Sequence, residues 1–168
     1  CNTAHAPEIF NLAKAGLGVR SGLQLLNMID ETVHYISTNF DNVTKVGILS
    51  TNGTYRFEVY SKPLQQNGFD VLLPGLDFND EYVHQAIYHP EFGIKSNRGV
   101  ATAEALKRLD AAIDWYVGNG AEILILGCTE LPLIKEQLEA KPIVPVDPSE
   151  VLARALIRNY SPEKLLNP

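Results

Sequence analysis

Continuous apolar runs alternate with amphipathic segments along this chain. Five runs are short and rich in β-branched or aliphatic residues, and they cover residues 23–29, 43–49, 69–73, 123–126 and 143–146. An apolar run without alternation is typical of a strand that is covered on both faces. We therefore predict a strand at each run.

The segments between these runs predict helices. The longest covers residues 100–117, where apolar side chains recur at helical spacing. Pro7 fits the first turn of a helix ending near Gly16 or Gly18, and Pro63 is a local misfit in a helix over 55–66. The remaining predicted helices cover residues 31–40, 81–87, 130–139 and 149–159, and residues 76–98 are otherwise irregular.

Strands that alternate with helices predict an α/β fold with a parallel sheet. Ligands of such sheets bind outside the carboxyl ends of the strands. Polar clusters follow two of the predicted strands, at residues 51–54 and 128–130, and we expect a third, at residues 1–3, to lie at the same edge. We therefore expect one site at this edge of the sheet.

Cys128 lies directly after the run at residues 123–126 and before a predicted helix. The N–H groups at a helix N-terminus, and the positive end of its dipole, lower the pKa of a thiol and make the thiolate available near neutral pH. The alternative is a small buried core cysteine, which is the commoner situation for a free thiol.

Composition narrows the classes of function. The chain has 168 residues, 45% of them hydrophobic, and a formal net charge of −6. No basic cluster indicates a nucleic-acid partner, and no apolar run is long enough for a membrane span or resembles a signal peptide. Two cysteines without a CxxC motif favour neither a disulfide framework nor a zinc site. We expect a cytoplasmic location.

Three motifs in order resemble the aspartate/glutamate racemase family: CNTAH at residues 1–5, STNGT at 50–54 and GCTELPL at 127–133. The resemblance implies two similar lobes with parallel sheets flanked by helices, and an active site in the cleft with one cysteine from each lobe. It implies no pyridoxal phosphate, metal or other cofactor. Residues 43–146 then form the second lobe, while residues 1–42 and 147–168 belong to an incomplete first lobe. We expect a homodimer, and an upstream segment of the same chain that completes the first lobe and without which residues 1–168 are not an active monomer.

The resemblance implies cofactor-independent racemisation of an acidic amino acid, aspartate in the first place, by proton transfer between two thiols. A thiolate removes the α-proton from one face and a thiol returns a proton to the other, as general acid–base catalysis requires. The catalytic residues are then Cys1 and Cys128. The substrate-binding residues are Asn2, Thr3, Thr51, Gly53, Thr54, Thr129, Glu130 and Lys95. Glu130 after Cys-Thr resembles the aspartate branch, and Lys95, with Arg98 behind it, is the expected cation for the substrate's side-chain carboxylate.

Several of these residues also have a structural interpretation. Lys95 suits a solvated loop, Glu130 suits the N-terminus of a helix, and His5 suits either orientation of the Cys1 thiolate or a capping role. Alternative functions are a hydantoin racemase or maleate isomerase of the same fold, an amidohydrolase with Cys1 as N-terminal nucleophile, and a ligand-binding relative without turnover. The continuous apolar strands count against the amidohydrolase, because such hydrolases are built on antiparallel sheets with alternating patterns.

Overall fold

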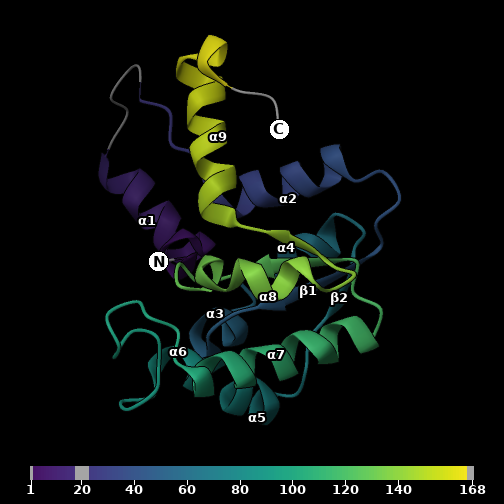
Figure 1. Ribbon diagram of the computed structural model, residues 1–168. Helices are drawn as coiled ribbons and strands as arrows, with labels where there is room; N and C mark the ends of the chain where they lie inside the picture. The colour runs from purple at the N-terminus through teal and green to yellow at the C-terminus, as the bar shows by residue number, and fades with distance from the viewer. Residues whose placement is uncertain (1, 18–22, 166–168) are drawn as a thin grey trace.

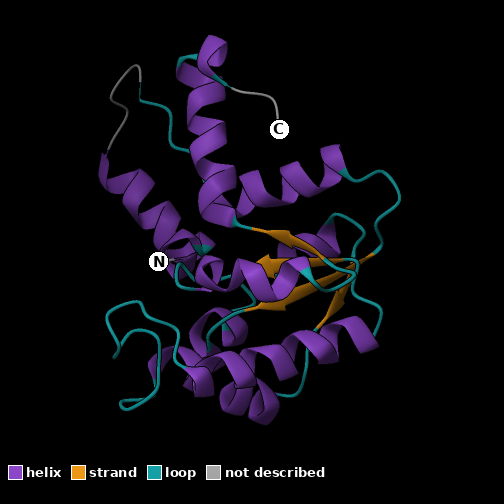
Figure 2. Cartoon of the chain, in the orientation of Figure 1, coloured by secondary structure: helices purple, strands orange, loops and turns teal. Residues whose placement is uncertain are grey.

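A four-stranded parallel sheet runs through the computed structural model, which describes residues 2–17 and 23–165. Its strands lie in the order β2-β1-β3-β4, and their arrowheads point to the side of the molecule where α1 lies (Figures 1 and 2). The strands are β1 (Lys45–Leu49), β2 (Asp70–Leu72), β3 (Ile123–Leu126) and β4 (Val144–Val146). The prediction of an α/β fold with a parallel sheet flanked by helices is confirmed.

Helices cover both faces of this sheet (Figure 2). The longest, α7, begins after Thr102, whose side chain accepts a hydrogen bond from the Ala105 N–H, and α9 begins after Asp147, which accepts one from the Ser149 N–H. The helical elements are η1 (Asn2–His5), α1 (Pro7–Leu17), α2 (Met28–Asn39), α3 (Asn52–Arg56), α4 (Ser61–Gln66), α5 (Leu76–Phe78), η2 (Asn79–His84), α6 (Gln85–Tyr88), α7 (Ala103–Gly118), η3 (Leu131–Ile134), α8 (Lys135–Glu139), α9 (Pro148–Tyr160) and η4 (Pro162–Lys164).

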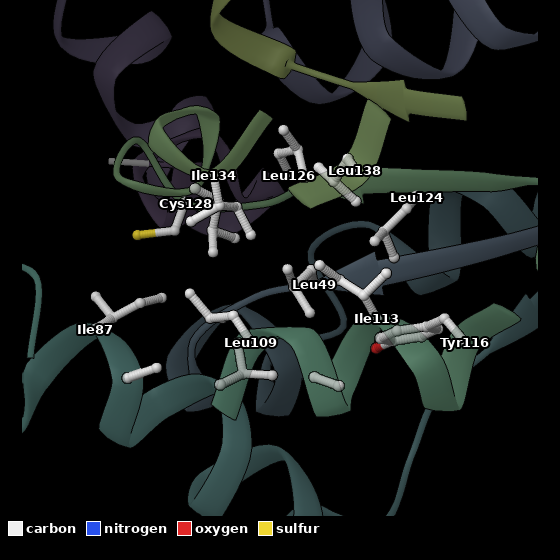
Figure 3. Packing of buried hydrophobic residues seen from close by; sticks show 14 of the residues in the cluster. Leu49, Ile87, Leu109, Ile113, Tyr116, Leu124, Leu126, Cys128, Ile134 and Leu138 are labelled. Atoms are coloured by element: carbon white, nitrogen blue, oxygen red, sulfur yellow. The ribbon is translucent and has the colours of Figure 1, made fainter. Parts of the chain in front are cut away.

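Two hydrophobic clusters lie on opposite faces of the sheet, because successive side chains of a strand point to opposite faces. Within β1 and within β3, the even-numbered and the odd-numbered apolar side chains therefore lie in different clusters. One cluster joins Val46 and Ile48 to α2, α4 and α9. The other joins Leu49 and Leu124 to η2, α6, α7 and α8, and Figure 3 shows its packing. The central strands are thus buried on both faces, as their unbroken apolar runs predict.

The predicted strand at residues 23–29 is wrong. Residues 23–27 have no regular structure, and Met28 begins α2. The Asn27 side chain accepts a hydrogen bond from the Ile29 N–H and donates one to the His5 carbonyl, so this residue caps the helix. The apolar run therefore divides at Asn27, because the residues after this cap adopt the helical backbone of α2 and cannot continue a strand.

Two other predicted helices are divided in the structure. The helix predicted over residues 55–66 is two short helices, α3 and α4, and the break lies near Glu58, whose φ is 50°. Pro63 does not cause the break, because it lies in the first turn of α4, where a missing N–H is tolerated. The helix predicted over residues 130–139 is the 3₁₀ helix η3 followed by α8.

Helices α2 and α9 lie against each other above the sheet (Figure 1), where Arg158 of α9 forms an ion pair with Glu31 of α2 at 2.7 Å. Their buried side chains pack in the cluster that also contains β1 and β3. The described residues form a single sheet, so the two-lobe architecture and the boundaries at residues 42 and 147 stay predictions. None of the helices in the described ranges is long and apolar enough to cross a bilayer.

Candidate active site

The ends of β1 and β3 bring two polar loops together. The register pairs Leu49 with Leu126, and the Gly127 N–H donates a hydrogen bond to the Leu49 carbonyl at 2.8 Å. A Cβ at Gly127 would lie 2.9 Å from the Cβ of Ser50. A glycine therefore allows the two strand ends to approach this closely, and Thr51 and Cys128 leave the sheet side by side.

Cys128 is a buried thiol at the rim of a hydrophobic cluster. The residue is 9% exposed, and its sulfur points away from the packed side chains of the cluster in Figure 3. Its Sγ donates a hydrogen bond to Oε2 of Glu130 at 2.9 Å. Burial, and next the hydrogen bond to the Glu130 carboxylate, raise the pKa of the thiol to about 11.

The prediction that the pKa of Cys128 is lowered is therefore wrong. It assumed that an α-helix N-terminus follows the thiol, whereas the next element is the four-residue 3₁₀ helix η3. The N–H groups and dipole of so short a helix do not compensate for burial next to a carboxylate. Cys128 is consequently a protonated thiol at neutral pH.

Glu130 connects Cys128 with the predicted cation Lys95. Oε1 of Glu130 lies 2.7 Å from Nζ of Lys95, and Oε2 also accepts a hydrogen bond from Oγ1 of Thr129 at 3.0 Å. Partial burial opposes ionisation of Glu130, but hydrogen bonds from Cys128, Lys95 and Thr129 outweigh it and hold its pKa below the usual value. The hydrogen bond to Glu130 likewise raises the pKa of Lys95. The result is a charged pair beside a neutral thiol.

Lys95 is held in place by its loop as well as by Glu130. The loop after α6 turns back on that helix, because the Ile94 and Lys95 N–H groups donate to the carbonyls of Ala86 and Ile87. The Lys95 ammonium lies 5.3 Å from the ring centroid of Tyr88, within cation–π range. Tyr88 was not predicted as a site residue, since only the fold brings it to Lys95. Arg98, the second predicted cation, is exposed.

The N-terminal motif lies against the loop after β1. Oγ1 of Thr3 and Oγ1 of Thr54 are 3.2 Å apart, and Asn2 is almost completely buried. Cys1 precedes Asn2 and lies outside the described residues. Nδ1 of His5 accepts a hydrogen bond from the Met28 N–H, which supports the capping interpretation of His5. The structure therefore brings Thr3 of the CNTAH motif to the loop at the end of β1.

The loop after β1 carries Thr51, Gly53 and Thr54 in and before the short helix α3. Thr51 and Thr54 are buried, and no side chain lies within 4 Å of a Cβ placed on Gly53. Asn52, which was not predicted as a site residue, hydrogen-bonds to η2. Within the described ranges, no three His, Cys, Asp or Glu side chains are grouped to hold a metal ion.

Comparisons with known proteins find relatives of this chain. The chain matches the family model described as Asp/Glu/Hydantoin racemase over residues 1–156. It is 33% identical over 138 residues to a Pectobacterium carotovorum subsp. carotovorum protein described as "Uncharacterized protein in pnlA 3'region", covering 82% of this chain and 85% of that protein.

Two further relatives are racemases. The chain is 28% identical over 97 residues to the glutamate racemase of Limosilactobacillus reuteri (strain DSM 20016), covering 58% of this chain and 33% of that enzyme. The solved structure of Picrophilus torridus aspartate racemase superimposes with a TM-score of 0.66 at 27% identity, covering 95% of this chain and 59% of that one. The chain thus spans about three fifths of the solved enzyme's length.

Proposed function

Because the chain belongs to the Asp/Glu/Hydantoin racemase family, we propose that it racemises an acidic amino acid, aspartate in the first place, without a cofactor. The observation that supports this most directly is the connected series Cys128–Glu130–Lys95 at the joined ends of β1 and β3. It combines a thiol, a carboxylate that accepts its hydrogen bond, and a cation suited to an acidic substrate.

The raised pKa of Cys128 supports a role as proton donor in the resting protein. A thiol with a pKa of about 11 is protonated at neutral pH, so Cys128 is the proton donor of the pair. Cys1, as the opposite base, would remove the α-proton of the enantiomer whose Cα–H bond faces it. Cys128 would then deliver its proton to the other face of the planar carbanion, which inverts the configuration.

The reverse reaction requires Cys128 as a thiolate and Cys1 as a thiol. Forward turnover leaves the pair in that state, because Cys128 has given its proton to the carbanion and Cys1 holds the proton that it removed. Cys128 would then remove the α-proton of the product enantiomer: the Cα–H bond breaks, an S–H bond forms, and Cys1 returns its proton to the opposite face. Oε2 of Glu130, 2.9 Å from Sγ, would accept the hydrogen bond of the thiol form.

The loops around Cys128 supply hydrogen-bond donors for the two carboxylates of the substrate. As the α-proton leaves, negative charge spreads onto the α-carboxylate, so donors directed at that group stabilise the transition state. We assign this binding to Asn2, Thr3, Thr51, Gly53, Thr54 and Thr129. We assign the side-chain carboxylate to Lys95, whose ammonium has three N–H donors and is able to bind Glu130 and the substrate together.

An acidic side chain fits this site better than a hydantoin ring. A hydantoin has no carboxylate to pair with Lys95, and the only partner of the ammonium among the described acidic residues is Glu130. Aspartate is preferred to glutamate because Glu130 follows Cys128-Thr129, as in the aspartate branch that the sequence resembles.

The exposed apolar side chains of α1 and its neighbouring segment support the two-lobe proposal. No residue of α1 is buried, and Leu12 at 74% and Leu23 at 60% are the most exposed apolar residues of this part of the chain. We interpret these exposed apolar side chains as part of an interface. We propose that an upstream segment of the native chain covers it and completes the first lobe, in a homodimeric protein.

The test is an isotope experiment with the purified full-length protein and no added cofactor. L-Aspartate, D-aspartate, L-glutamate and L-alanine are incubated separately in D₂O, and chiral chromatography and ¹H NMR follow inversion and loss of the α-proton. Aspartate should invert with uptake of solvent deuterium, whereas alanine should not react. Cys1→Ser and Cys128→Ser should each lower the rate about 100- to 10,000-fold. Absence of inversion with every substrate, from folded protein, would disprove the proposal and favour a ligand-binding relative.

A further inference from the structure

Asn52 is held by three side chains of η2, the π-helical turn Asn79–His84. Its Oδ1 accepts a hydrogen bond from Nδ2 of Asn79 at 2.9 Å, and its Nδ2 donates to Oδ1 of Asp80 at 2.5 Å. Its backbone N–H donates to Nδ1 of His84 at 3.4 Å. Both ends of the amide and the backbone of this residue are therefore held by one turn of helix.

Asn79 fixes the loop on both sides of Thr51. This residue is completely buried, and its Nδ2 donates to the Ser50 carbonyl at 3.2 Å as well as to Oδ1 of Asn52. Thr51 thus lies between two anchored residues. A buried side chain that bonds to both neighbours of a residue restricts the backbone of that residue, because each bond would be lost by a shift of the loop.

The π-helical geometry makes this contact possible. An i to i+5 turn is wider than an α-helical turn, and π-helical turns recur at functional sites. The backbone N–H of Gln85 bonds to the Asp80 carbonyl, which is the wider spacing. The turn then continues into α6, where Tyr88 packs against His84 with ring centroids 5.0 Å apart and supports Lys95.

We propose that Asn52 is a positioning residue, which places the donors of the loop at Thr51–Thr54 against the α-carboxylate of the substrate. Asn79, Asp80 and His84 are its anchor. The inference rests on the proposed racemase function. It adds that a single helical segment, from Asn79 to Tyr88, positions both the donor loop and Lys95. This segment therefore determines the separation of the two carboxylate subsites.

The polarity of the Asn52–Asp80 pair provides the experiment. Asn52→Asp places a second carboxylate against Asp80, so the two oxygens repel and the loop shifts. Asp80→Asn in the same protein restores one hydrogen bond, now donated by the new amide to the new carboxylate. Asp80→Asn alone keeps an acceptor for Asn52 and should stay within about 3-fold of wild type. Asn119→Asp is the matched control, because its exposed amide donates to a helix carbonyl at the other end of the sheet.

Racemisation kinetics of the full-length protein are measured for these variants. Asn52→Asp should lower kcat about 10- to 100-fold with a smaller change in KM, because a misplaced donor loop weakens transition-state stabilisation most. The double variant should recover to within about 3-fold of Asp80→Asn. An unchanged kcat in Asn52→Asp, or no recovery in the double variant, would overturn the inference. If Asn52→Asp does not fold, Asp80→Ala removes the acceptor without adding charge and should lower kcat in the same way.

Backbone hydrogen exchange separates this inference from the proposed function. Exchange of the amides at residues 50–57 should accelerate in Asn52→Asp and return to the wild-type rate in the double variant, whether or not the protein racemises aspartate. An inactive wild type with this exchange pattern would refute the racemase proposal and retain the anchoring of the loop. An exchange rate that is the same in all variants would refute the anchoring itself.

Discussion

Cys128 Sγ and Glu130 Oε2 lie 2.9 Å apart, so the thiol donates a hydrogen bond to a carboxylate two residues further along the chain. The same carboxylate pairs with Lys95 at 2.7 Å through its other oxygen. Protonation of the thiol and occupation of Lys95 are therefore coupled through one side chain, which leads to the following predictions.

Glu130→Gln should lower the pKa of Cys128 below its value of about 11. The substitution removes the negative charge that accepts the thiol's hydrogen bond. It also removes the carboxylate that neutralises the Lys95 ammonium. Both changes favour the thiolate. The rate of alkylation of Cys128 by iodoacetamide, measured against pH by peptide mass spectrometry, reports the pKa. The exposed Glu139→Gln is the matched control. A higher pKa in Glu130→Gln would contradict the assigned role of the carboxylate.

The stability that Cys128 contributes should fall at alkaline pH. Its pKa in the folded protein, about 11, is above the usual 9.0, so the folded state binds the proton more tightly than the unfolded state does. The contribution is complete below pH 9 and is lost as the pH rises to 11, by about 3 kcal/mol. Urea unfolding of wild type and Cys128→Ser at pH 8 and pH 10.5 measures it. From pH 8 to pH 10.5 the free energy of unfolding should fall more in wild type than in Cys128→Ser. A difference between the two proteins that does not change with pH would contradict the prediction.

Lys95→Ala should weaken the binding of acidic substrates. The loss of a charged hydrogen-bond donor to the side-chain carboxylate costs about 2 kcal/mol, which corresponds to roughly a 30-fold increase in KM for aspartate. Lys95→Arg keeps the charge and should lose less. The exposed Lys107→Ala serves as control for a general change in charge. Steady-state racemisation of aspartate and thermal unfolding distinguish the cases, since a lowered Tm and kcat without a raised KM would indicate a structural role for Lys95.

Gly127→Ala should destabilise the protein by about 1–3 kcal/mol and displace Cys128. The added Cβ would lie 2.9 Å from the Ser50 Cβ and 3.1 Å from the Leu49 carbonyl oxygen, so the two strand ends have to separate. Gly118→Ala at the end of α7 is the control, because nothing lies within 4 Å of its Cβ position. Chemical denaturation measures both variants. Equal stability of Gly127→Ala and wild type would show that the strand ends adjust without cost.

The sequence alone determined the class of fold and the edge of the sheet at which the candidate residues after β1 and β3 lie. The apolar runs of β1 and β3 are unambiguous because both faces of these strands are buried, and helix spacing in α7 is sustained over sixteen residues. The carboxyl ends of parallel strands meet at one edge, so Thr51 and Cys128 were predicted to be neighbours from the pattern of elements. The family motifs added the hypothesis of a two-thiol mechanism.

Tertiary structure decided what the local pattern leaves open. Residues 23–27 have strand-like composition, but Asn27 caps α2, and a cap is recognised only when its partner N–H groups are in place. The pKa of Cys128 depends on burial and on Glu130, not on the helix that local sequence predicts after it. Asn79 reaches Asn52 from 27 residues along the chain, and Tyr88 reaches Lys95 only because the loop after α6 turns back on that helix; no periodicity encodes such contacts. Propensity is a short-range property of the chain, whereas burial, pKa and the anchoring of Asn52 arise only after distant segments have packed together.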